Sequence, residues 1–197
     1  NSPYHVTQDI VVDSGVTLNI EAGVVVNLDD GIRFDVNGTL IARGSSSQKI
    51  VFQPTSGTTP GSWDMIYFSD SSVDTILDEE GNYSSGSVLQ YCVIQYGGGG
   101  EANASVELRS ASPLIEHCEI QNGGHRGIYA ENSNSIIRNN RIISNQPPDQ
   151  NNYYQGGGIY IHSGSLKVGK ESFILFSSFM VTIINICRYS YPSPSKL

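Results

Sequence analysis

The sequence predicts an all-β protein whose short strands wind into a solenoid, and three observations favour this fold class. Only 15% of the 197 residues are charged while 21 are glycine, a composition typical of turn-rich β proteins. Short runs of alternating apolar and polar residues follow one another, separated by turn residues. Finally, similar segments recur at spacings of 22 to 26 residues, which is typical of stacked repeat units.

The alternation is clearest in the N-terminal part of the chain. Strands are predicted at 16–20, 24–28, 32–36 and 40–42. The turns between them are Glu21-Ala22-Gly23, Asp29-Asp30-Gly31 and Asn37-Gly38-Thr39, each with a Gly or Asn that tolerates a positive φ. Strands this short, joined by corners this tight, indicate a chain that bends repeatedly and does not form long hairpins.

The repeats also predict which strands are neighbours. Residues 114–120 align with 136–142 at an offset of 22 and with 88–94 at an offset of 26, and 158–162 repeat 127–131. The offset of 22 places three pairs of opposite charge on neighbouring strands: Glu116 with Arg138, Glu119 with Arg141, and Arg109 with Glu131. Outward-facing neighbours of a sheet prefer such pairs, so the apolar residues between them are predicted to point inward.

Four segments carry a common coil pattern: 10–24, 36–44, Gly61-Ser62-Trp63 with Ile66-Tyr67-Phe68, and 137–142. They resemble the right-handed parallel β-helix repeat proteins, which occur among surface and secreted proteins of bacteria and archaea, including carbohydrate-active ones. Family members usually carry glycines between the Trp and the Ile-Tyr pair, where this chain has Asp64-Met65. The resemblance covers roughly residues 4–168. It implies a single-stranded right-handed parallel β-helix with coils of about 22–26 residues, a scaffold that serves many functions.

Two regions are predicted from this pattern: a β-helix at 1–168 and an atypical apolar segment at 169–197. Its apolar stretch, residues 172–187, lacks the Gly/Asn corner pattern of the coils and is too short for a membrane span. It is either a cap over the last coil or a truncated or misread end, and the sequence leaves both open. Because the chain starts at Asn1 without an apolar leader, it is expected to be a mature or excised piece.

Charge and cysteine content narrow the function classes. The formal net charge of −8 and the lack of a basic stripe argue against nucleic acid as a partner. The acidic, lysine-poor composition predicts an extracellular or cell-surface location. Cys92, Cys118 and Cys187 are too few for a disulfide framework. Cys92 and Cys118 are expected to share an inward column with Asn140, and whether the two thiols form a bridge stays open.

A long acidic loop at 69–86 interrupts the coils and offers one candidate metal site. Its carboxylates are Asp70, Asp74, Asp78, Glu79 and Glu80. Carboxylate oxygens are the ligands that Ca²⁺ prefers, so calcium is the one cofactor considered. The spacing of a dedicated calcium loop is absent, and a solvated run of charges explains the same residues.

A lateral strip offers the candidate ligand site. Arg109, Glu131 and His162 are predicted to form one outward column, flanked by Tyr129 and Tyr160. Tyr153 and Tyr154, in a second long loop at 146–155, could extend the strip. Aromatic rings stack on sugars and charged groups hold hydroxyls, so the strip could bind a polysaccharide or surface glycan. The alternative is an ordinary ladder of complementary side chains.

No catalytic residue is assigned from the sequence. His125 and Arg126 follow two glycines, but the repeat columns show no carboxylate pair of the kind that cleaves sugars. The favoured function is therefore a non-catalytic extracellular or cell-surface module, a rigid spacer with glycan binding on its lateral face. The alternatives are a polysaccharide lyase or glycoside hydrolase with its site at the long loops, and a structural protein that assembles end to end as a homo-oligomer.

Overall fold

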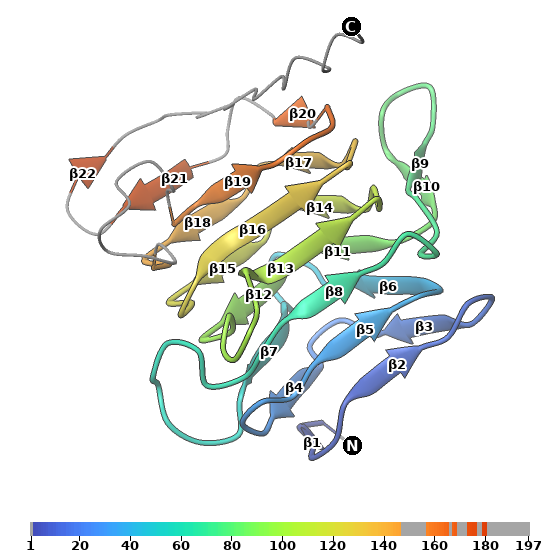
Figure 1. Ribbon diagram of the computed structural model, residues 1–197. Helices are drawn as coiled ribbons and strands as arrows, with labels where there is room; N and C mark the ends of the chain where they lie inside the picture. Colours follow the sequence, from blue (N-terminus) through green and yellow to red (C-terminus); the bar gives the residue numbers. More distant parts are fainter. Residues whose placement is uncertain (1, 147–156, 166, 169–172, 177–178, 181–197) are drawn as a thin grey trace, which may run out of the picture.

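The computed structural model describes residues 2–146, 157–165, 167–168, 173–176 and 179–180. Three sheets surround one core, and each coil of the chain contributes one strand to each sheet (Figure 1). Sheet 1 contains, in spatial order, β1 (Tyr4–Val6), β4 (Val25–Leu28), β7 (Ile50–Pro54), β12 (Cys92–Gln95), β15 (Glu119–Gln121), β18 (Arg141–Ile143), β21 (Phe173–Phe176) and β22 (Phe179–Met180).

The other two large sheets have six strands each. Sheet 2 contains β2 (Ile10–Val12), β5 (Phe34–Val36), β8 (Ile66–Phe68), β13 (Ala104–Arg109), β16 (Arg126–Glu131) and β19 (Ile159–Ile161). Sheet 3 contains β3 (Thr17–Ile20), β6 (Thr39–Arg43), β11 (Val88–Gln90), β14 (Leu114–Glu116), β17 (Ile136–Arg138) and β20 (Lys167–Val168). Neighbouring coils pair in parallel, for example β13 with β16 and β14 with β17. The predicted all-β parallel β-helix is confirmed.

The predicted register is confirmed as well. Glu116 pairs with Arg138 across β14 and β17, and Glu119 pairs with Arg141 across β15 and β18. Arg138 Nε lies 2.7 Å from Glu116 Oε1, and Arg141 Nη1 lies 3.8 Å from Glu119 Oε2. The third expected pair also forms an ion pair, between Arg109 and Glu131.

The core consists of columns of apolar side chains that repeat from coil to coil. In sheet 2 the inward column is Phe34, Ile66, Val106 and Ile128, all buried. Trp63 is the largest fully buried side chain, and its Nε1–H donates a hydrogen bond to the Gln95 carbonyl oxygen at 2.8 Å. Stacking of similar side chains fills the interior at high density, so each coil stabilises the coils on either side of it.

Single residues in the left-handed conformation turn the corners of the coils. Tyr91, His117 and Asn139 have φ of 50°, 54° and 56° and occupy one corner in three successive coils. The sequence offsets of 26 and 22 place these three residues in one column, and the structure has them half-buried at the corner. The rings of Tyr91 and His117 stack with centroids 4.6 Å apart. Stacking on this corner offsets part of the cost of a positive φ in non-glycine residues.

Asn140 occupies the inward column shared with Cys92 and Cys118, as expected. Its Oδ1 accepts a hydrogen bond from the Cys118 N–H at 2.8 Å, and its Nδ2 donates to the Ile115 carbonyl oxygen at 2.8 Å. Both cysteines are buried free thiols, and burial raises the pKa of Cys92 well above its ordinary value. The question left open by the sequence is thus answered: this pair is not bridged.

A ladder of side-chain amides runs along the outward face of sheet 1. Gln53 Nε2 donates to Asn27 Oδ1 at 3.0 Å, Gln95 donates to Gln53 at 3.0 Å, and Gln121 donates to Gln95 at 3.1 Å. The two middle amides, Gln53 and Gln95, each donate toward the N-terminal coil and accept from the C-terminal one. The ladder therefore connects four successive coils by side chains alone.

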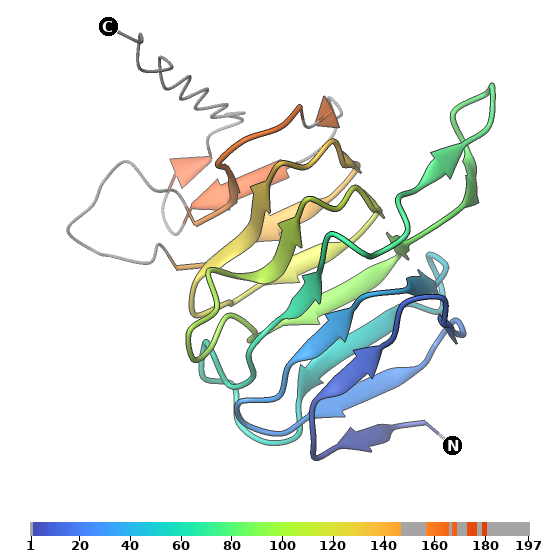
Figure 2. The ribbon, with the colours of Figure 1, turned by 45° about the vertical axis from the view of Figure 1, so that its right-hand side comes forward.

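The segment 69–86, predicted as a loop, contains a two-stranded antiparallel hairpin of β9 (Ile76–Leu77) and β10 (Tyr83–Ser85). Figure 2 shows this hairpin projecting from the side of the coils. Within the described part of the chain, no helix is long and apolar enough to cross a membrane.

Parallel pairing continues past residue 168. β21 pairs in parallel with β18, and β22 turns back antiparallel to β21. Sheet 1 therefore extends into the atypical segment. The rest of 169–197, including Cys187 and the choice between a cap and a misread end, lies outside the described residues.

Candidate functional site

The candidate site lies on the outward face of sheet 2. An apolar–polar–apolar triplet recurs on five of its strands, and the middle residue of each triplet points outward. The first four of these residues are Asp35, Tyr67, Glu107 and Tyr129, paired in register from β5 to β16. Tyr160 on β19 continues the column. The sheet therefore presents carboxylates and aromatic rings at the spacing of adjacent strands.

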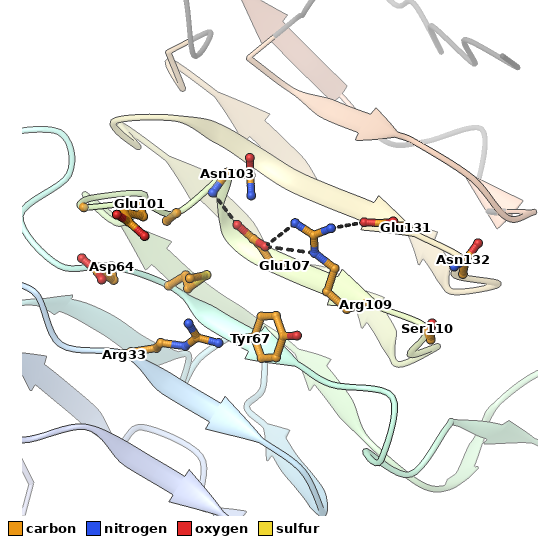
Figure 3. Close-up of a pocket in the computed structure, with 13 residues that line it drawn as sticks. Arg33, Asp64, Tyr67, Glu101, Asn103, Glu107, Arg109, Ser110, Glu131 and Asn132 are labelled. Atoms are coloured by element: carbon orange, nitrogen blue, oxygen red, sulfur yellow. Dashed lines mark hydrogen bonds and ion pairs between the residues drawn. The ribbon is translucent and has the colours of Figure 1, made fainter.

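A cavity of about 770 Å³ opens on this face (Figure 3). Its wall combines β8, β13 and β16 with the corner that precedes β13. The charged groups in the wall are Arg33, Asp64, Glu101, Glu107, Arg109 and Glu131. Tyr67, Asn103, Ser110 and Asn132 add polar atoms. A concave site with several converging polar groups is the usual form of a ligand site.

Glu107 is the structural centre of the cavity wall. Only 3% of its side chain is exposed, so its charge requires nearby donors. The Asn103 N–H donates to Oε1, and Arg109 Nε and Nη2 each lie 3.4 Å from Oε2. Arg109 Nη1 in turn pairs with Glu131 (Figure 3). The guanidinium is thereby held between two carboxylates and compensates the charge of one of them.

Arginine side chains cover the tyrosine rings of this face. Arg33 Cζ lies 4.4 Å from the centroid of the Tyr67 ring, and Arg109 Cζ lies 4.4 Å from that of Tyr129. Arg126 Cζ lies 4.6 Å from the centroid of Tyr160. These are cation–π distances. Each ring holds a guanidinium in place, and each guanidinium occupies ring surface that a ligand would otherwise contact.

The structure changes the role expected of Tyr129. Tyr129 is only 9% exposed, with Arg109 over its ring and the Tyr160 ring 5.6 Å away. Burial raises the pKa of its hydroxyl. Tyr129 therefore supports the wall and offers little free surface for a sugar ring, whereas Tyr160 is half-buried and His162 is exposed.

Asp64 and Glu101 line the opposite end of the cavity together with Arg33. Burial raises the pKa of Asp64 above its ordinary value, the negative charges of Asp9, Asp30 and Glu101 raise it further, and Arg33 opposes them. The carboxylate of Asp64 is therefore held at an electrostatic cost. Carboxyl groups perturbed in this way concentrate at functional sites.

This cost predicts that Asp64→Asn will stabilise the protein at neutral pH. A carboxyl whose pKa is raised on folding opposes folding once the pH rises through that pKa, and asparagine removes the penalty. Because Asp64 is partly solvated, screening keeps the expected increase in Tm small, about 1–2 °C at pH 7. The difference should vanish below the ordinary pKa of 3.8. Thermal unfolding between pH 3 and 7 tests this, and an equal loss of stability at both ends would contradict it.

The structure brings together most of the predicted lateral strip. Arg109 pairs with Glu131, and the next coil places His162 beside Glu131, since His162 N–H bonds to the Ala130 carbonyl. The rings of Tyr129 and His162 lie 6.5 Å apart. Tyr153 and Tyr154 lie outside the described residues.

His125, the histidine next to Arg126 in the sequence, lies away from the cavity wall. His125 is half-buried at the corner before β16 and is absent from the cavity wall. Burial lowers its pKa, and the charge of Arg126 lowers it further. At this corner His125 packs against the glycine-rich loop, where a Cβ on Gly98 would lie 2.9 Å from the backbone nitrogen of His125.

The five carboxylates considered for calcium are dispersed along the hairpin segment. Asp78 accepts from the Asn82 N–H at 2.7 Å, and Asp74 accepts from the Ser112 N–H at 2.7 Å. Asp70, Glu79 and Glu80 are exposed. In the part of the chain that the structure describes, no group of three or more His, Cys, Asp or Glu side chains could hold a metal ion. The structure does not bring these carboxylates together.

Sequence reasoning missed the cavity residues outside the strip, above all Arg33, Asp64, Glu101 and Glu107. A signal was present in the triplets Phe34-Asp35-Val36, Ile66-Tyr67-Phe68 and Val106-Glu107-Leu108. The hairpin insertion separates the second and third triplets by 40 residues, and this distance hid the repeat. Alignment of the triplets would have placed Tyr67, Glu107 and Tyr129 on adjacent strands.

Comparison with known proteins agrees with this architecture. Residues 62–177, more than half of the chain, match the family described as right-handed beta helix region. No curated protein and no solved structure matches the chain. The chain belongs to the right-handed β-helix family.

Proposed function

We propose that this protein is a non-catalytic β-helix module that binds a glycan in the cavity on sheet 2, outside the cell or at its surface. The observation that carries the proposal is the cavity wall itself, in which Glu107, Arg109 and Glu131 hold one another beside an opening of about 770 Å³. A sugar hydroxyl both donates and accepts hydrogen bonds. A wall that carries both carboxylates and guanidiniums can accept a hydrogen bond from the hydroxyl and donate one to it.

The wall is fixed before any ligand binds. Arg109 has a carboxylate on either side and an aromatic ring beneath it, and Arg33 lies over Tyr67 while pairing with Asp35 at 2.5 Å. Side chains that are already ordered lose little conformational entropy on binding. This matters for glycans, since individual hydrogen bonds to hydroxyls contribute little net free energy in water.

The polarity of the wall disfavours other classes of ligand. The lining is mostly polar or charged, which does not suit an apolar ligand. The net charge of −8 and the paired state of Arg33 and Arg109 do not suit a polyanion. An uncharged or cationic polyhydroxylated ligand fits these features best.

Replacement of Arg33 by methionine should weaken glycan binding about tenfold or more, because it removes donors from the wall while retaining much of the apolar stem. Arg43→Met is the matched control: Arg43 lies 4.7 Å from the Tyr83 ring on another face and is absent from the cavity wall. A glycan array identifies a ligand, and isothermal titration then compares both variants with the parent protein.

Equal losses in the two variants, or no binding to any glycan, would contradict the proposal. The same protein samples should be assayed for new reducing ends and unsaturated products. Turnover would show that the module is an enzyme, in agreement with the alternative of a lyase or hydrolase.

A further inference from the structure

The two ends of the cavity differ in their charge balance. At the Arg109 end, the guanidinium contacts the carboxylates of Glu107 and Glu131, and Arg126 adds positive charge near Glu107. At the other end, Asp64 and Glu101 line the wall, and Figure 3 shows both on the side away from Arg109. Among the described lining residues each end has two carboxylates and one arginine, and the ends differ in the charges just behind the wall, where Asp9 and Asp30 add negative charge near Asp64.

The backbone fixes the acidic end in place. A Cβ added to Gly100 would lie 2.8 Å from Asp64 Oδ1, so the loop that carries Glu101 packs directly against the Asp64 carboxylate. The Gly98 N–H also donates to the Asp64 carbonyl oxygen at 2.5 Å. The two carboxyl groups are therefore held at the same end by the fold and do not depend on flexible side chains alone.

The nearest cation does not neutralise this end. Arg33 reduces the negative potential at Asp64 but forms its ion pair with Asp35, at 2.5 Å. Asp9 and Asp30 on the preceding corners add to the potential at Asp64. A ligand group that enters here is favoured if it is positively charged and can donate hydrogen bonds.

We infer that the cavity takes a glycan with free amino groups, a deacetylated amino sugar, and binds its ammonium between Asp64 and Glu101. The inference rests on the proposed function and specifies its ligand class. An ammonium group offers three donors, and it compensates carboxylates that a neutral sugar would leave unpaired. Uronate-containing glycans are disfavoured because their carboxylates would face those of the protein.

Isothermal titration with a glucosamine hexamer and an N-acetylglucosamine hexamer tests the inference, at low salt and at a pH where the amine is protonated. The two probes have the same backbone and differ in charge. The glucosamine hexamer should bind about tenfold more tightly or better. Glu101→Gln should remove most of that preference, whereas Glu79→Gln, the same charge change on the exposed hairpin, should preserve it.

The outcomes separate the two proposals. Equal affinity for both hexamers, with sensitivity to Arg33→Met, would overturn the amine inference and support glycan binding. Binding to neither hexamer would also overturn it, and the array would then decide the proposed function. Binding of the acetylated hexamer that appears only with Ca²⁺ would assign the acidic end to a metal ion and overturn the inference. A preference that disappears when the amine is deprotonated supports it.

Discussion

Trp63→Ala is expected to lower the free energy of unfolding by about 3–5 kcal/mol. Trp63 is fully buried, and a Cβ on Gly97 of the next coil would lie only 2.9 Å from the indole ring. Truncation leaves a cavity in a core of stacked coils and removes the hydrogen bond to the Gln95 carbonyl oxygen. Because the lining atoms belong to several coils, the cavity cannot close by a local rearrangement.

Urea denaturation followed by circular dichroism measures this loss, since Trp63 is the single tryptophan and the variant has no indole fluorescence. Trp63→Phe separates the effect of lost side-chain volume from that of the lost hydrogen bond. Phenylalanine fills much of the space and still leaves the Gln95 carbonyl oxygen without its donor. Tyr4→Ala is the control, as Tyr4 is 51% exposed on β1 and should cost within about 0.5 kcal/mol. A similar cost for Tyr4 and Trp63 would contradict the core described above.

Asn140→Ala is expected to lower the free energy of unfolding by a comparable amount, about 1–3 kcal/mol for each of two buried backbone groups left unsatisfied. The groups are the N–H of Cys118 and the carbonyl oxygen of Ile115, both bonded to the Asn140 amide. Asn140 is 1% exposed, so bulk water does not reach these groups without a rearrangement of the corner.

Asn134→Ala is the matched control for this prediction. Asn134 Oδ1 also accepts a backbone N–H, that of Ser165 at 3.2 Å, but at an exposed position where water replaces the bond. Urea denaturation of both variants measures the difference. If Asn140→Ala costs no more than Asn134→Ala, a water molecule has taken over both bonds and the amide is not required.

The repeat made most of the fold predictable from sequence. The offset of 22 correctly paired Glu116 with Arg138 and Glu119 with Arg141, because complementary charges and apolar columns recur together only in one register. The hairpin of β9 and β10 could not be predicted in the same way. Its strands have two and three residues, which is too short for a period to be recognised.

The site was predictable only in part. The Arg109–Glu131 pair followed from the offset, since it depends on the backbone register alone. The burial of Tyr129 and Glu107 could not be predicted from the offset, because it depends on where the side chains of Arg33, Arg109 and Arg126 extend over the sheet. Alternation places a residue on the outward face, but long neighbouring side chains determine whether that face contacts water.

In the amide ladder of sheet 1, all the hydrogen bonds point in the same direction along the solenoid axis. Gln95 can donate to Gln53 only while it accepts from Gln121, so reversal of one amide would oppose oxygen to oxygen on one side and N–H to N–H on the other. The ladder therefore has two low-energy states: every amide has the orientation described above, or every amide is reversed. Aligned bonds polarise one another, so Asn27 and Gln121 are coupled in orientation although 94 residues separate them in sequence.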